Sequence, residues 1–366
     1  MPRNEVGSGR RLCLPIEQWP EADRAGWRRA MQDPGLFGRN SIASAWAEAT
    51  RAGTMAGYGR WLSWVAEKGI EMSGPPADRV TPPRVEAYIV DLRRINGGFT
   101  ILRRGQALYD AIRIIAPDRG WGWLLRVQNV LHARSVPVRD KRTHIRPTAE
   151  LVKLGKVLMR AAENAVTKPP LKRAISFRDG LMIAFLALRP LRLSNLAMMT
   201  LKRHLVRQAS GYCLYFNGRE VKGGKPIETN VPDSLVGDFD RYLDHYQPIL
   251  LTRGGRRRPR ECDAVWISRI AAPLDYKAIP DRVAKHTRAA FGKHLWVHLF
   301  RHCAATTIAT DDPKNVRSII SVLGHSTPAP SEKYYNQAGT LEASRRYQQI
   351  LADWLEGFDD NGARDT

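Results

Sequence analysis

The chain has 366 residues, of which 43% are hydrophobic, so it is long enough for two domains with buried cores and its composition argues against global disorder. Lys and Arg total 58 against 36 Asp and Glu, which gives a formal net charge of +22. Such an excess indicates a polyanionic partner, either nucleic acid or an anionic membrane surface.

The membrane alternative is the weaker of the two. No apolar run approaches the roughly 18–20 residues of a spanning helix, and the N-terminus lacks the apolar core of a signal peptide. The four cysteines, at positions 13, 213, 262 and 303, form no Cys-x-x-Cys pair. We therefore expect a cytoplasmic protein with reduced thiols, rather than a zinc site or a disulfide framework.

Residues 1–37 show no strong hydrophobic period and form an N-terminal extension of unknown role. Residues 38–133 carry three apolar stripes at the spacing of amphipathic helices, so they predict a small all-helical domain. Gly69 ends the first pattern, Thr81 opens the second and Pro117 stops the third. The stripes are Tyr58, Trp61, Leu62 and Val65; Val85, Tyr88, Ile89 and Leu92; and Ile101, Leu108, Ile112 and Ile115.

Residues 134–147 are predicted to be a linker between two domains, because they contain two prolines and little apolar surface. The segment is also basic. It either lies along a phosphate backbone or is a solvated linker without contacts. Its candidate DNA-binding residues are Arg139, Lys141, Arg142 and Arg146.

The second predicted domain covers residues 148–366. Thr148 is a candidate N-cap for its first helix, and residues 177–200 read as another helix. Alternating apolar residues over 212–216 then predict a strand. The tight turn at Gly223 and Gly224 would lead into a return strand.

A basic loop follows at 251–260, where we assign equal weight to DNA contact and simple solvation; its candidate DNA-binding residues are Arg256, Arg257 and Arg258. The chain becomes helical again from Val297. A further helix is predicted to begin at residues 311–313 and to end at Gly324, and residues 340–356 form a last amphipathic helix. The whole pattern predicts a mainly α fold with a small β-sheet (α+β).

The chemistry-bearing residues gather near the C-terminus. His298 and Arg301 are spaced i, i+3, which puts them on one helix face where they could hold a phosphate. A buried histidine and a salt-bridged arginine would give the same spacing. His325 follows a helix end. Tyr334 is a phenol with an ordinary pKa of about 10, and clustered cations would favour its phenolate form.

Together these residues resemble the C-terminal signature of the tyrosine recombinase (phage-type integrase) family. The signature is His-x-x-Arg-His at 298–302, Leu-Gly-His at 323–325 and a tyrosine at 334. The family also has an upstream arginine, matched by Arg192 in Pro-Leu-Arg-Leu-Ser-Asn-Leu, and a hairpin lysine, matched by Lys222. The resemblance covers residues 148–356 as a mixed catalytic domain. It covers residues 38–133 only as a helical pattern of the size of the family's core-binding, DNA-clamping domain.

The resemblance implies a role for each matched residue. Tyr334 would attack a DNA phosphodiester, form a 3′-phosphotyrosyl bond and release a 5′-hydroxyl without ATP. Arg192 and Arg301 would bind the non-bridging oxygens, and Lys222 would protonate the leaving oxygen. His298 would assist proton transfer or stabilise the phosphate, and His325 would donate a hydrogen bond to it. No metal and no cofactor are implied.

Four positions depart from the pattern or compete with it. The family's acidic residue three after the first arginine is Asn195 here, which can hydrogen-bond but brings no charge. Tyr335 is adjacent to Tyr334, and the family spacing selects Tyr334. Lys225 competes with Lys222, and Arg189 competes with Arg192.

The resemblance implies a site-specific recombinase or integrase of a mobile element, which would serve integration, excision, dimer resolution or transposition. Its partner would be double-stranded DNA, which places it at the nucleoid. It would act as a homotetramer on two DNA sites or assemble with sister recombinases. The C-terminal helix over 340–356 would pack against a neighbouring subunit or fold back on its own domain. The alternatives are a type IB topoisomerase or telomere resolvase, and a DNA-binding protein that has the fold without the activity.

Overall fold

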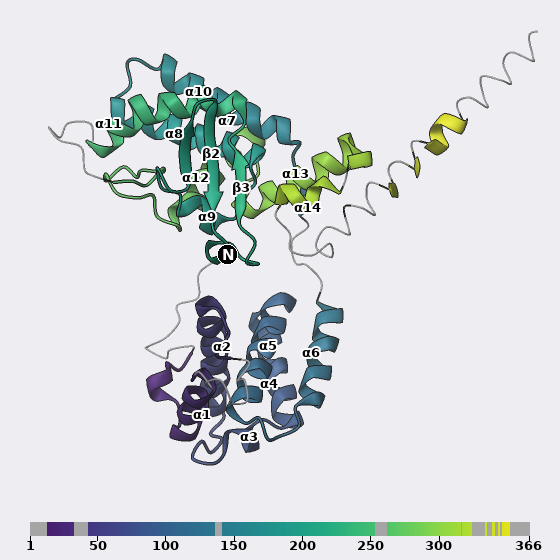
Figure 1. Cartoon of the computed structure of the whole chain (residues 1–366). Helices are drawn as coiled ribbons and strands as arrows, with labels where there is room; N and C mark the ends of the chain where they lie inside the picture. Colours follow the sequence, from purple (N-terminus) through teal and green to yellow (C-terminus); the bar gives the residue numbers. More distant parts are fainter. Residues whose placement is uncertain are drawn as a thin grey trace, which may run out of the picture. The chain divides into compact units, whose positions relative to one another are not determined.

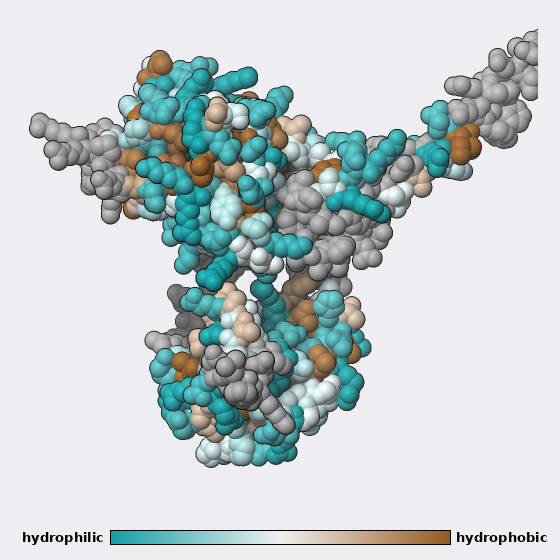
Figure 2. All heavy atoms as spheres, in the orientation of Figure 1, coloured by the Kyte–Doolittle hydropathy of each residue, from teal (hydrophilic) through white to brown (hydrophobic). Residues whose placement is uncertain are grey.

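The computed structural model describes residues 13–32, 43–135, 141–252, 262–315 and 317–323, together with residue 334 and several positions from 339 to 351. The chain divides into two compact units, Met1–Asp140 and Lys141–Thr366, which are described separately (Figure 1). Hydrophilic residues cover much of the visible face of each unit, as the charge of the chain requires (Figure 2). All four cysteines are free thiols. No helix in the described ranges is long and apolar enough to cross a membrane.

Unit 1 is all-helical in its described residues. The three apolar stripes predicted from the sequence are the buried faces of α2, α4 and α5, so this prediction is confirmed. Pro82 begins α4 directly after Thr81, where its missing N–H costs nothing. The elements are η1 (Ile16–Gln18), α1 (Glu21–Met31), α2 (Glu48–Glu67), α3 (Pro76–Arg79), α4 (Pro82–Ile95), α5 (Gly98–Ile115) and α6 (Gly122–Arg134).

The N-terminal extension is part of this core where it is described. Trp19 and Trp27 are buried in the hydrophobic cluster of unit 1. Asp23 is fully buried on α1, accepts a 2.6 Å hydrogen bond from the Tyr58 hydroxyl and pairs with Arg79. The sequence showed no helical period here because a buried carboxylate interrupts the apolar face of α1. The described residues of the predicted extension thus pack into the same hydrophobic cluster as α2, α4 and α5.

Unit 2 is built around α8 (Pro170–Leu188), whose residues 177–187 are all buried. Helix α7 (Thr148–Asn164) packs closely against it, because Gly155 and Gly180 let the two backbones approach. A Cβ placed on Gly155 would lie 2.6 Å from the Gly180 carbonyl oxygen. Thr148 is the first residue of α7 rather than its N-cap. Its backbone N–H is satisfied instead by the hydroxyl of Thr307, at 3.0 Å.

The helix predicted over 177–200 is two helices. Helix α8 ends at Leu188, and α9 (Leu193–Ala197) begins five residues later. Pro190 lies between them and has no N–H with which to continue the helical ladder. The break matters because it leaves Arg192 as the N-cap of α9, in extended backbone, rather than in the middle of a helix.

A three-stranded antiparallel sheet lies beside these helices in the order β1-β2-β3 (Figure 1). The predicted strand is β2 (Gly211–Phe216), and the return strand is β3 (Ile227–Asn230). Strand β1 (Leu205–Gln208) was not anticipated. The turn is also longer than expected, because residues 217–226 connect β2 to β3 and contain the 3₁₀ turn η3 (Gly218–Glu220). The fold is mainly α with one small sheet, as predicted.

The C-terminal helices also differ from the sequence pattern. Helix α13 (Val297–Asp311) ends where the next helix was predicted to begin, and that next helix is the short α14, which begins only at Ser318 (Ser318–Leu323). Gly324 and positions 341, 342, 345 and 352–356 lie outside the described residues, and the described positions of the helix predicted over 340–356 are helical. The remaining elements are α10 (Asp233–Arg241), the π-helical turn η4 (Tyr242–Tyr246), α11 (Gln247–Leu251), α12 (Ala278–Phe291) and η5 (Pro313–Asn315).

Candidate active site around Arg301 and Tyr334

Arg301 joins three segments of unit 2. Its side chain rises from α13 and is only 5% exposed. The guanidinium donates one hydrogen bond to the Pro190 carbonyl at 2.8 Å and another to the Leu323 carbonyl at 2.5 Å. A guanidinium has five N–H donors, so these two bonds leave others to face an anion. Arg301 therefore fixes the α8–α9 connection and the end of α14 around one positive charge.

Arg192 lies close enough to Arg301 for their charges to interact. Burial, followed by the charge of Arg192, lowers the pKa of Arg301 to about 10, so it stays protonated at neutral pH. Burial also lowers the pKa of Arg192. Within the described residues neither guanidinium has an ion pair with a carboxylate. Two adjacent, half-buried or buried cations without a counter-charge form a site that an anion would stabilise.

Tyr334 lies close enough to Arg301 for their charges to interact. Its side chain is 4% exposed and packs in a small apolar cluster with Ala305, Ala309, Ile319 and Leu323. Burial raises the pKa of Tyr334 to about 12, the Cys303 thiol adds to the shift, and the charge of Arg301 only partly opposes it. The expectation that clustered cations favour the phenolate is therefore corrected, because desolvation is the larger effect.

His302 contacts Tyr334 directly. A hydrogen bond joins His302 Nδ1 to the Tyr334 hydroxyl, and the tautomer of the ring decides which group donates. The rings of His298 and His302 meet edge to face, with centroids 5.1 Å apart. His298 and Arg301 both lie on α13, where His298 is exposed and Arg301 is buried. His302 was not among the residues predicted for the site; its i, i+4 spacing from His298 was the signal that could have identified it.

Lys222 lies exposed in the connection between β2 and β3. Two residues earlier, Glu220 forms a capping box with Asn217 across η3. Asn195, which is 1% exposed on α9, donates from Nδ2 to the Glu220 carbonyl at 3.0 Å. The asparagine that departs from the family pattern thus links the helix capped by Arg192 to the Lys222 connection. A carboxylate at this position could not donate that bond.

The competing residues have different surroundings. Lys225 is exposed on the same connection as Lys222. Arg189 donates from Nε to the Asn230 carbonyl at 3.1 Å, at the end of β3. Within the described part of the chain, no three His, Cys, Asp or Glu side chains are grouped to hold a metal ion.

The predicted DNA-binding residues are only partly described. Lys141 is exposed. Arg146 packs its guanidinium over the Phe291 ring, 5.7 Å from the centroid, and its backbone N–H meets the Cys303 sulfur at 3.4 Å. The predictions that lie outside the described residues are His325, Tyr335, Arg139, Arg256, Arg257, Arg258 and the side chain of Arg142.

No family model matches the chain, and no curated protein matches it in sequence. Solved structures do match. The XerH site-specific recombinase bound to a palindromic difH substrate, in a post-cleavage complex, aligns with a TM-score of 0.56 and 10% identity over 94% of this chain and 99% of that chain. This alignment shows that the chain has the fold of a site-specific recombinase.

Two further structures align with lower scores. The XerA recombinase gives a TM-score of 0.38 and 17% identity over 89% of this chain and 98% of that chain. The pre-cleavage complex of XerH with difH aligns with a TM-score of 0.40 and 12% identity over 88% of this chain and 96% of that chain.

Proposed function

We propose that this chain is a site-specific DNA recombinase of the tyrosine type, in which Tyr334 is the nucleophile. The observation that carries the proposal is the cluster of Arg192, Arg301 and Tyr334. Two arginines without a carboxylate partner among the described residues lie beside a buried phenol. A phosphodiester is the anion that such a cluster could both bind and cleave.

The division of labour follows from charge and geometry. Arg301 is held in place before DNA arrives by its two bonds to backbone carbonyls, so it would stabilise transition-state charge without reorganising. Arg192 would bind a second non-bridging oxygen. The Tyr334 oxygen would form the new P–O bond while the 5′-oxygen leaves. Lys222, on its exposed connection, would give that oxygen a proton.

The neutral state of Tyr334 is consistent with this chemistry. With its pKa raised to about 12, the phenol is protonated at neutral pH and is not a nucleophile by itself. The Tyr334 proton must therefore be accepted as the P–O bond forms. His302 touches the hydroxyl and His298 touches His302, so the two imidazoles provide a route from the phenol to solvent.

We further propose that unit 1 acts as the DNA-clamping domain and that four protomers assemble on two duplexes, because recombination exchanges four strands. The charge of +22 supports a large phosphate contribution to binding. The affinity for duplex DNA should consequently fall steeply as salt concentration rises.

The deciding experiment is covalent trapping. Duplexes that bind the full chain are selected from a random library and rebuilt with a nick near the scissile position, so that the cleaved end diffuses away. Wild type, Tyr334→Phe and Tyr335→Phe are compared on a denaturing gel, and the adduct peptide is identified by mass spectrometry. We expect an adduct at Tyr334 in wild type and Tyr335→Phe, and none in Tyr334→Phe.

Other results would change the proposal in defined ways. Loss of the adduct only in Tyr335→Phe would move the nucleophile by one residue. An adduct on any sequence, with relaxation of supercoiled DNA and no joining of two sites, would favour a topoisomerase. Tight binding with no adduct in any protein would favour a DNA-binding protein without cleavage activity.

A further inference from the structure

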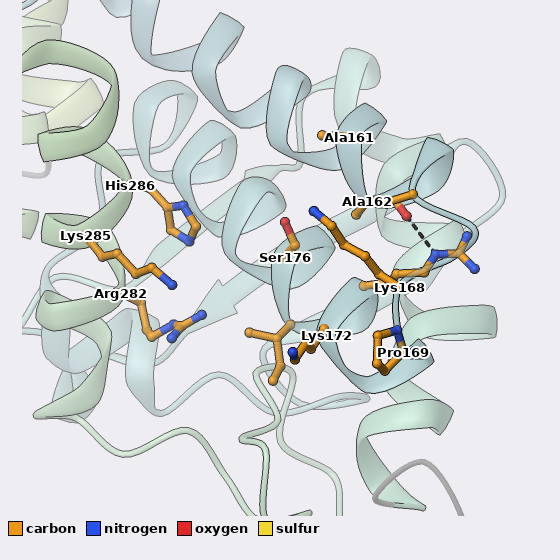
Figure 3. A pocket seen from close by; sticks show the side chains of 12 residues that line it. Ala161, Ala162, Lys168, Pro169, Lys172, Ser176, Arg282, Lys285 and His286 are labelled. Carbon is orange, nitrogen blue, oxygen red and sulfur yellow. Dashed lines mark hydrogen bonds between the residues drawn. The ribbon is translucent and has the colours of Figure 1, made fainter.

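A second basic site lies in unit 2, at the N-terminal end of α8. A cavity of about 550 Å³ opens there between the C-terminal end of α7, the first turns of α8 and the middle of α12. Figure 3 shows Arg282, Lys285 and His286 projecting from α12 toward Ser176, with Lys168 and Lys172 on the opposite side. No carboxylate lines the cavity.

The side chains of Arg173 and Arg282, which line this cavity, are hydrogen-bonded to other groups of the protein. Arg282 donates from Nε to a carboxylate oxygen of Asp179 at 2.8 Å, and His286 meets the same oxygen at 3.0 Å. Arg173 donates to the carbonyls of Ala162 and Glu163 at 2.8 and 3.0 Å. These contacts fix the walls of the cavity.

The three lysines that line the cavity differ from the arginines in this respect. In the described ranges, no hydrogen bond or ion pair involves the ammonium groups of Lys168, Lys172 or Lys285. Asp179, the carboxylate that holds Arg282 and His286, is fully buried and is also paired with Arg178. The start of α8 adds the positive end of a helix of 19 residues. The positive charges that converge here therefore exceed the negative charges that face them.

We propose that this cavity is a phosphate-binding site separate from the candidate cleavage site. A phosphate group offers several acceptor oxygens and a charge that three unpaired ammonium groups could neutralise, and the Ser176 hydroxyl lies among them as a further donor. An apolar ligand would leave these cations desolvated and unpaired. The phosphate belongs either to a small polyphosphate or to the backbone of duplex DNA.

The cavity and the cleavage site are at opposite ends of α8. Ser176 lies in its second turn, whereas Arg192 follows its C-terminal end. The 12 residue-to-residue steps from Ser176 to Leu188 alone span roughly 18 Å along the helix axis at about 1.5 Å per step. One phosphate cannot reach both sites, so binding in the cavity does not depend on cleavage at Tyr334.

The test compares the full chain with two charge-matched variants. The cavity variant is Lys168→Gln/Lys172→Gln/Lys285→Gln. The control is Lys153→Gln/Arg160→Gln/Lys314→Gln, which removes three exposed cations elsewhere on unit 2. Inorganic pyrophosphate is titrated into each protein by calorimetry. A parallel titration in Arg192→Gln removes the contribution of the cleavage site. Hydrogen exchange of α8 verifies that all variants are folded.

For a small polyphosphate, pyrophosphate should saturate one site per chain in Arg192→Gln. The cavity variant should lose at least about tenfold in affinity, and the control should be unchanged. For the DNA backbone, pyrophosphate should not saturate, but the slope of log affinity for duplex DNA against log salt should fall by about 0.9 per lost phosphate contact in the cavity variant only. Equal behaviour of the cavity variant and the control in both titrations would overturn the proposal. That result would leave covalent trapping by Tyr334 unaffected, so the two proposals fail separately.

Discussion

Tyr334 and His302 are hydrogen-bonded to each other, although 31 residues separate them along the chain. His302 lies on α13, directly after Arg301, and Tyr334 packs against the same helix through Ala305 and Ala309. One helix thus supplies an imidazole to the phenol hydroxyl and a guanidinium close to it. Helix α13 therefore helps to position the candidate nucleophile.

Replacing His302 should slow cleavage without changing DNA affinity. His302→Leu removes the partner of the Tyr334 hydroxyl, and we expect adduct formation to fall by about 10²-fold, the lower range for assisted proton transfer. His302→Asn keeps a polar atom near the position of Nδ1, so it should recover part of the rate. Single-turnover trapping on a nicked duplex measures both variants. Equal rates for His302→Leu and wild type would show that the contact has no part in the reaction.

Substitutions of Lys222 and of Asn195 should slow the same step, the protonation of the leaving oxygen. Lys222→Ala should lower the rate of adduct formation by about 10²–10⁴-fold if Lys222 is the general acid, whereas Lys225→Ala should change it by less than about tenfold. Asn195→Asp cannot donate to the Glu220 carbonyl, so we expect it to displace the Lys222 connection and slow the same step.

The leaving group distinguishes this defect from misfolding. In a substrate with sulfur in place of the bridging 5′-oxygen, the leaving group is a thiolate, which needs no proton. It should therefore restore most of the rate in both Lys222→Ala and Asn195→Asp. Rescue of Lys222→Ala but not of Asn195→Asp would mean that Asn195 acts through some other contact.

Asp179 should be important for the stability of unit 2. Burial alone would raise its pKa, but the charge of Arg178 and the contacts of His286 and Arg282 outweigh burial and lower the pKa well below the ordinary range. Asp179→Asn leaves these cations without a counter-charge, so it should cost about 3–5 kcal/mol in the free energy of unfolding at pH 7. Hydrogen exchange of α8 in urea measures the change, with the exposed Asp281→Asn as the control.

The same substitution should change the dependence of stability on pH. A carboxylate with a lowered folded-state pKa stabilises the protein above its unfolded pKa of about 3.9, and this stability is lost as pH falls further. The difference between wild type and Asp179→Asn should therefore be constant from pH 7 to about pH 5 and shrink below about pH 4. A difference that stays constant down to pH 2.5 would contradict the lowered pKa.

Asp23 should tie α1 to the rest of unit 1. Its carboxylate is fully buried and contacts both Tyr58 and Arg79. Asp23→Ala leaves the buried Arg79 charge without its partner. We therefore expect the free energy of unfolding to fall by about 3–5 kcal/mol and hydrogen exchange in α1 and α2 to become faster. Glu21→Ala, on the exposed face of the same helix, should cost less than about 1 kcal/mol. Equal losses in the two variants would show that the buried pair adds nothing.

The sequence by itself determined the features that depend on local spacing. The apolar stripes of α2, α4 and α5 were correct residue by residue, because a helical period of 3.6 is visible in any amphipathic helix. The order of the Arg192, Lys222, His298, Arg301 and Tyr334 motifs was also visible, and the fold that it implied agrees with the structural alignment to XerH. Periodicity could not reveal α1, whose buried face contains Asp23, or β1, whose burial does not alternate along the strand.

Only the tertiary structure decided the electrostatics. The sequence placed cations near Tyr334 and predicted a lowered pKa, but the pKa of this phenol depends on burial by Ala305, Ile319 and Leu323, which come from two helices. The contacts of Asn195 with Glu220 and of His302 with Tyr334 likewise join segments that are distant along the chain. Desolvation and hydrogen bonding sum over neighbours in space, whereas a sequence motif records only neighbours along the chain.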